Sequence, residues 1–177
     1  MSKACRSETN RVAILLRNAL RENKDSTPVY YVTDVDLKDD AADVLECAKS
    51  VKKALSGNNK TCPSFMLISA DVTNLIVVVY VADATTQYVS GETTKYVADA
   101  TTKYDATAKE WMLKSLEPVL GVSDLPSLTE NDDFICFDGK FDTPFKLKDT
   151  VRSAAFAYLR SHNLLQEESD EEDEFLF

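Results

Sequence analysis

The chain has 177 residues, of which 44% are hydrophobic, and this size and composition are typical of a single globular domain. No apolar run approaches the roughly 20 residues that cross a bilayer, and residues 1–6 lead into polar sequence, so we expect no membrane association and no signal peptide. Seven of the ten net negative charges lie in residues 167–174, which leaves −3 for the rest, and without a dense basic run we expect no extensive nucleic-acid binding. A cytoplasmic or nuclear protein is the expectation.

Hydrophobic periodicity predicts two helices and three strands in the first half of the chain. The helices span residues 7–23, with Ser7 as N-cap, and residues 40–56; the strands span residues 29–33, 65–70 and 75–81. The last two strands form a hairpin. Residues 75–81 are apolar at nearly every position, which is typical of a strand buried on both faces, so we expect helices on both sides of the sheet.

Three consecutive eight-residue units, 80–87, 88–95 and 96–103, share a Tyr/Thr-rich pattern. Each can be read as a short strand followed by a turn, so the insertion at residues 80–105 is predicted to form a β-arm. Tyr88, Tyr96 and Tyr104 would then contact a protein partner. A duplication that only lengthens a surface loop and a helical segment are the alternatives.

The second half of the chain predicts two more helices and another hairpin. One helix begins near residue 106 and ends or kinks at Pro118, with Trp111 at the edge of its apolar face. The dipeptide Asp138-Gly139 predicts a tight hairpin turn. The last helix spans residues 149–162, with Asn163 capping it. This order predicts one α+β domain over residues 1–165, with an antiparallel or mixed sheet covered by about four helices.

The motifs of common catalytic sites are missing from the sequence. The four glycines do not form a phosphate-binding loop, and the four cysteines never form C-x-x-C, so we expect no cofactor and no metal. Cys47 and Cys136 are predicted to be core residues. An enzyme using Cys136 or Cys62 with the single histidine, His162, or using a carboxylate, stays an alternative. Asp34-x-Asp36 could ligate a cation, although capping a strand end is the preferred interpretation.

Residues 166–177 form an acidic tail that ends on apolar residues, and the block of like charge predicts disorder. The pattern of residues 167–177 resembles the ends of eukaryotic ribosomal stalk P-proteins, where acids also precede a Phe/Leu-rich terminus. This resemblance implies a binding mode in which acids steer towards a basic surface and apolar side chains enter a pocket. The candidate residues are Glu171, Glu172, Asp173, Glu174, Phe175, Leu176 and Phe177. Ser169, followed by acids, fits acidophilic kinases.

The function predicted from these features is a non-enzymatic protein-interaction or adaptor module, which engages partners through the tail and the repeat. The expected partner is a protein with a basic surface and an apolar pocket. For the tail, a solubilising role and docking on the chain's own body are the alternatives. For the whole chain, the alternatives are an actin-binding domain of the actin-depolymerising-factor type, similar only in the coarse order of elements, and the small enzyme named above.

Overall fold

The computed structural model describes residues 1–23, 29–37, 40–56, 62–82, 97–121 and 128–164, with only the backbone described for residues 97–107. Four helices and five strands lie in these residues. In chain order they are α1 (Lys3–Glu22), β1 (Tyr30–Asp34), α2 (Ala41–Ser56), β2 (Ser64–Ala70), β3 (Asn74–Tyr80), α4 (Val97–Leu120), β4 (Thr129–Asn131), β5 (Phe134–Lys140) and α5 (Pro144–Ser161).

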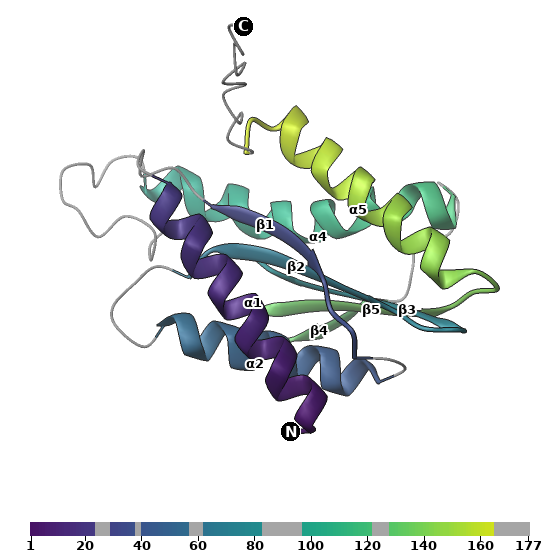
Figure 1. Ribbon diagram of the computed structural model, residues 1–177. Helices are drawn as coiled ribbons and strands as arrows, with labels where there is room; N and C mark the ends of the chain where they lie inside the picture. Colours follow the sequence, from purple (N-terminus) through teal and green to yellow (C-terminus); the bar gives the residue numbers. More distant parts are fainter. Residues whose placement is uncertain (24–28, 38–39, 57–61, 83–96, 122–127, 165–177) are drawn as a thin grey trace, which may run out of the picture.

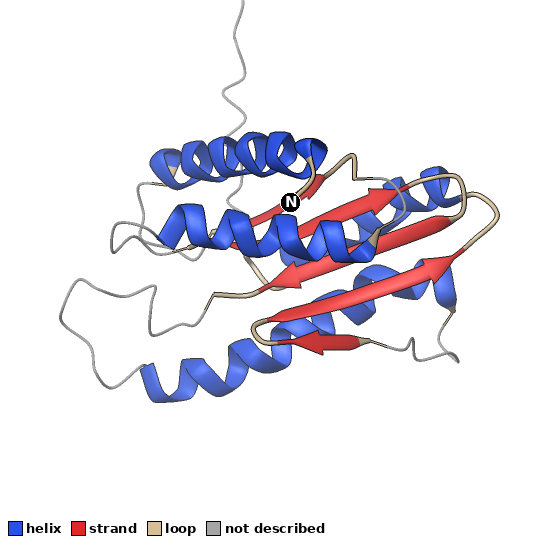
Figure 2. Ribbon diagram, turned by 90° about the horizontal axis from the view of Figure 1, so that it is seen from below, coloured by secondary structure: helices blue, strands red, loops and turns tan. Residues whose placement is uncertain are grey.

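The five strands form one mixed sheet in the order β1-β2-β3-β5-β4. Strand β1 pairs with β2 in parallel, whereas the other three pairings are antiparallel. Figure 1 shows α2 below the sheet, α4 and α5 above it, and α1 running obliquely to the left of β1. Figure 2 looks from below and shows α1 as the uppermost helix, beside α2. The prediction of an α+β fold with a mixed sheet and four helices is confirmed.

The core consists of two apolar layers, one on each face of the sheet. Helices α1 and α2 pack against one face together with Phe65 and Leu67, and α4 and α5 pack against the other with Met66 and Ile68. Because successive side chains of a strand point to opposite faces, β2 supplies residues to both layers. All residues of β3 from Leu75 onward are buried, which confirms a central strand covered on both sides.

Two helices begin earlier than their apolar periodicity predicts. Helix α1 starts at Lys3, where Ser2 is the N-cap and accepts a hydrogen bond from the Cys5 amide at 3.1 Å. The predicted start at Ser7 is wrong because the first turn is anchored by Cys5, which is buried. Thr9 is also buried, and its hydroxyl donates a hydrogen bond to the Cys5 carbonyl at 2.8 Å, so this polar group is satisfied within the helix. Helix α5 begins at Pro144, a residue that favours the first helical turn, rather than near residue 149.

The turn predicted at Asp138-Gly139 is also wrong, because both residues lie inside β5. Gly139 is paired with Leu75 of β3. The chain reverses instead between β4 and β5, where Asp132 adopts a positive φ of 51°. Gly139 is required for space: a Cβ there would lie 2.5 Å from Cζ of Phe137 and 2.8 Å from Cε2 of Phe141.

Helix α4 includes most of the third repeat unit. It begins at Val97, so the strand-and-turn interpretation does not hold for residues 97–105. Residues 83–96 lie outside the described residues, and the remaining repeat stays a prediction. Trp111 is fully buried, not at the edge of the apolar face, and Pro118 lies inside the helix, which continues to Leu120.

Candidate functional site

The residues predicted to bind partners lie outside the part of the chain whose side chains are described. Residues 166–177, including Ser169 and the Phe175-Leu176-Phe177 ending, belong to the undescribed C-terminal segment. Tyr88 and Tyr96 belong to the segment 83–96, and Tyr104 lies in α4 where only the backbone is described. The geometry of a candidate site therefore comes from the body of the protein.

The outward face of α1 is the most basic helical surface among the described residues. All five of its basic residues are exposed, and each lies within about 80° of Ile14 when 100° per residue is projected around the helix axis. They are Lys3, Arg6, Arg11, Arg17 and Arg21. We call these five residues and Ile14 the α1 basic face. Its acidic neighbours, Glu8 and Glu22, lie at the margin of this face by the same projection.

Packing on the opposite side of α1 determines which side chains face outward. Val12 and Leu16 are fully buried in the layer shared with α2. The Arg17 guanidinium donates to the Ala54 carbonyl of α2 at 3.1 Å. Arg11 forms an ion pair with Glu8 at 2.6 Å and also donates to the Asp34 carbonyl of β1. Helix α1 is thus held at its middle and towards its C-terminal end, and its basic face has a fixed orientation.

Ile14 adds an apolar centre to the α1 basic face, because 54% of its surface is exposed. Among the described residues, Lys3, Arg6 and Arg21 make neither an ion pair nor a side-chain hydrogen bond. The face therefore offers three uncompensated cations around an exposed isoleucine. Two other large apolar side chains, Val72 and Phe145, are exposed at 75% and 56%, but they lie at the β2–β3 turn and at the start of α5.

A second group of charges joins β1 to α5. The Asp34 carboxylate forms ion pairs with Arg152 at 2.9 Å and with Lys148 at 3.3 Å. Arg152 also pairs with Asp149 at 2.6 Å. These contacts give Asp34 a structural role as the link between the edge strand and α5. Within the described residues no group of three or more His, Cys, Asp or Glu side chains could hold a metal ion, so the cation-ligand interpretation of Asp34 and Asp36 gains no support.

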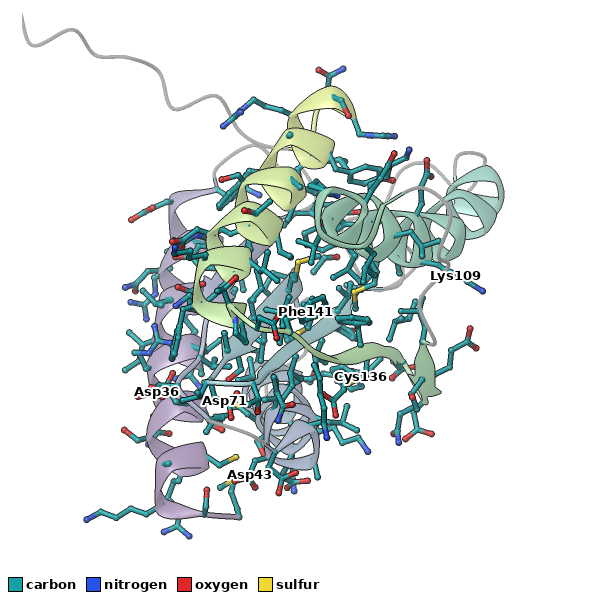
Figure 3. All side chains as sticks on the ribbon, turned by 90° about the vertical axis from the view of Figure 1, so that its right-hand side faces the viewer. Asp36, Asp43, Asp71, Lys109, Cys136 and Phe141 are labelled. Atoms are coloured by element: carbon teal, nitrogen blue, oxygen red, sulfur yellow. The ribbon has the colours of Figure 1, made fainter. Side chains whose placement is uncertain are left out.

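Figure 3 looks along the sheet towards the end at which β1 finishes. Asp36 lies there beside α1, and Asp71 lies at the β2–β3 turn. The Glu8 carboxylate accepts a hydrogen bond from the Asp36 amide at 3.3 Å. Lys109 projects from α4 on the opposite side of the molecule from α1. The exposed lysine Lys109 of α4 is therefore well separated from the α1 basic face.

All four cysteines are buried and none is in a disulfide. Burial raises the pKa of the Cys47 and Cys136 thiols to about 11 and that of Cys62 to about 12. Burial also raises the pKa of Cys5. A nucleophilic cysteine requires the thiolate near neutral pH. These environments favour the neutral thiol, which argues against the cysteine-dependent enzyme and confirms Cys47 and Cys136 as core residues.

His162 is the C-cap residue of α5, and local contacts explain its position. Its ring packs on Tyr158 with a centroid distance of 4.1 Å, and Nδ1 lies 2.9 Å from the Tyr158 carbonyl. Asn163 follows with a positive φ of 55°, and the Leu164 amide donates to the Leu159 carbonyl. This closure is a common helix end, so the predicted capping role of Asn163 is confirmed.

The α1 basic face does not stand out as a run of charge in the sequence. Its basic residues are separated by three to six positions, so they gather only when the helix forms. A helical projection of residues 3–21 would have found it, provided that the helix start had been placed at Lys3. The pattern of basic residues was missed because the predicted helix began at Ser7 and left out Lys3 and Arg6.

The fold and its surface define a class: a three-layer α+β domain that carries a basic helical face and an acidic C-terminal segment. No family model matches the chain, and no curated protein matches it in sequence. Among solved structures, the chain is similar to CDC45 from Entamoeba histolytica, with a TM-score of 0.41 and 13% identity over 84% of this chain and 28% of that one. The chain thus spans less than a third of the length of this neighbour. None of the described helices is long and apolar enough to span a membrane.

Proposed function

We propose that the protein is a non-enzymatic interaction module whose acidic–apolar tail binds a protein partner. The observation that carries this proposal is the distribution of charge and apolar residues: seven acids stand directly before Phe175-Leu176-Phe177, whereas the rest of the chain carries a net charge of only −3. Acids of this kind accelerate encounter with a basic surface, and aromatic side chains that enter a pocket supply most of the binding energy. The partner is expected to offer a basic surface beside an apolar pocket.

The buried thiols support the non-enzymatic part of this proposal, because their raised pKa values oppose cysteine catalysis at neutral pH. The repeat tyrosines Tyr88, Tyr96 and Tyr104 are proposed as an additional contact. Phosphorylation of Ser169 would add about −1.5 to −2 charge to the tail and strengthen its attraction to a basic partner.

The test is a pull-down from lysate with the full chain, a 1–165 truncation and a full-length F175S/L176S/F177S variant. A partner retained by the full chain and lost from both variants supports the proposal, and binding should weaken from low to moderate salt because exposed charges are screened. Both core layers lie within residues 5–159, so the truncation should keep the circular dichroism spectrum of the body. Equal recovery by all three proteins would contradict a role for the tail.

Filamentous actin is tested separately by co-sedimentation, because the actin-depolymerising-factor alternative needs no tail. Actin binding by the 1–165 truncation would replace the proposed function with that alternative. The repeat would be tested next by replacing Tyr88 and Tyr96 with serine in the full chain.

A further inference from the structure

We propose that, in the absence of a partner, the acidic–apolar tail docks on the α1 basic face of the same chain. This inference rests on the proposed function of the tail as a binding segment, and it adds the regulation of that segment. The occupant of the α1 basic face is residues 166–177 of the same molecule.

Charge complementarity is the first argument. The tail brings seven acids, and the α1 basic face presents five basic residues, three of which make no ion pair within the described residues. On the rest of the described surface, five of the ten basic side chains are in ion pairs with acids, for example Lys52 with Asp133, Lys114 with Glu117 and Lys148 with Asp34. The other five are spread over α2, β5 and α5, whereas α1 gathers on one helix face three cations that are unpaired within the described residues. The face of α1 is therefore where the acids of the tail gain most.

Apolar complementarity is the second argument. The tail ends in two phenylalanines and a leucine, which need an apolar contact to leave water. Ile14, exposed at 54%, is the large apolar side chain that lies among the basic residues of α1. Val72 is more exposed, but the β2–β3 turn around it brings a single lysine, Lys140, which is paired in register with Asn74, in place of the several cations around Ile14.

The length and starting point of the tail are the third argument. Lys148 and Arg152, in the N-terminal half of α5, pair with Asp34 at the end of β1, so α5 runs back along β1 towards its start, into which α1 leads. In Figure 1 the C-terminal ends of α1 (purple) and α5 (yellow) both point towards the upper left. The 13 residues after Leu164 can extend about 45 Å, and the 20 residues of α1 are about 30 Å long. Ile14 lies eight residues, about 12 Å, from the C-terminal end of α1, so an extended tail has about 30 Å left to bridge the ends of the two helices and can place its apolar end near Ile14.

The experiment uses the full chain with one cysteine appended after Phe177 and labelled with a nitroxide. The native thiols are buried and have raised pKa values, so the label goes to the appended residue. The nitroxide broadens the amide signals of nearby residues in an isotope-labelled protein. We expect broadening along α1 around Ile14, and little on residues 109–117 of α4, which lie on the opposite side.

Two variants with matched controls test which residues hold the tail. R6E/R21E should lower the docked-to-free ratio about tenfold, equivalent to about 1.4 kcal/mol. K109E/K114E makes the same change in net charge on α4 and should leave the broadening unchanged. I14S should reduce it, whereas V72S should not. Added salt should also reduce the broadening, because it screens exposed contacts between the arginines of α1 and the acidic residues of the tail.

Uniform broadening, or broadening unaffected by R6E/R21E and I14S, would overturn the proposal. A mixing experiment combines chains that carry the nitroxide but no isotope label with chains that carry the isotope label but no nitroxide. Broadening in this mixture would assign the face to the tail of a second copy and refute docking in the same molecule. These outcomes do not depend on the pull-down. Tail-dependent partner binding without broadening on α1 would keep the proposed function and reject only its regulation.

Discussion

Replacing Gly139 with alanine should destabilise the protein, although alanine usually suits a strand better than glycine. A Cβ at this position would lie 2.5 Å from Cζ of Phe137, whereas ordinary van der Waals contacts begin near 3.4 Å. Phe137 is buried, so its ring has little room to move, and Phe141 lies 2.8 Å from the same Cβ. Overpacking of this kind costs about 1–3 kcal/mol, and the better propensity of alanine returns about 0.5–1 kcal/mol.

Because the new Cβ would meet two rings below 3.0 Å, we expect the overpacking cost in the upper part of its range, about 2–3 kcal/mol, which leaves a net loss for G139A of about 1–2.5 kcal/mol of the free energy of unfolding. It is measured by urea denaturation, followed through the fluorescence of Trp111, which is the single tryptophan of the chain and is fully buried. A double-mutant cycle with F137L separates steric conflict from other effects, because leucine removes the atom that the new Cβ would meet. In the F137L background, G139A should cost at least about 0.5 kcal/mol less.

Additive effects of G139A and F137L, or a stability of G139A within about 0.5 kcal/mol of the unmodified protein, would refute this reasoning. The neighbouring residue provides a further check on the strand. Asp138 is exposed and pairs with Ile76, so D138T should be neutral or slightly stabilising in a strand. A loss above about 1 kcal/mol would instead indicate the tight turn suggested by the Asp-Gly dipeptide.

Two further predictions concern ion pairing and thiols. D34N should lower the free energy of unfolding by about 1 kcal/mol, because the Asp34 carboxylate forms ion pairs with both Lys148 and Arg152. D149N should change it by less than about 0.5 kcal/mol, because Asp149 is exposed and forms one ion pair. Equal effects of the two variants in urea denaturation would contradict the structural role of Asp34. Burial raises the pKa of Cys62 to about 12 from 9.0, so its contribution to stability is complete below pH 9 and is lost as the pH rises towards 12. The urea midpoint of C62A should therefore fall less steeply than that of the unmodified protein between pH 9 and 11, and parallel slopes would argue against the raised pKa.

Features that depend on local periodicity could be predicted from the sequence. The continuous apolar run of β3 indicated a strand covered on both faces, and the alternating contributions of β2 to two layers follow from the same logic. The first turn of α1 was missed because Cys5 is its single buried residue and shows no apolar period by itself, and because the Ser2 cap lies five residues before the predicted one. Thr9, although polar, is buried because its hydroxyl donates to the Cys5 carbonyl within the helix. Polar residues that bond to their own helix can be buried without breaking the pattern of packing.

Features that depend on distant partners could not be predicted. The Asp-Gly signal at residues 138–139 reflects local turn preference, whereas the pairing of Gly139 with Leu75 and the space taken by Phe137 and Phe141 arise only in the assembled sheet. Similarly, the link of Asp34 to Arg152 joins residues 118 positions apart. The α1 basic face combines both cases, because its periodicity is local but its orientation depends on contacts with α2 and β1.

If the tail docks on α1, every partner of the tail must compete with the protein's own surface, and this competition has a measurable size. A short flexible connection gives an effective concentration of about 1 mM. For an isolated tail–α1 contact with a Kd of about 0.1 mM, the docked form then outweighs the free form about tenfold, and the apparent affinity for a partner falls by about the same factor. R6E/R21E should consequently tighten partner binding to the full chain up to about tenfold, measured by titration with the purified partner, while K109E/K114E should not. Weaker partner binding by R6E/R21E would mean that α1 contacts the partner directly, and that the basic face is part of the binding surface and not the regulator of the tail.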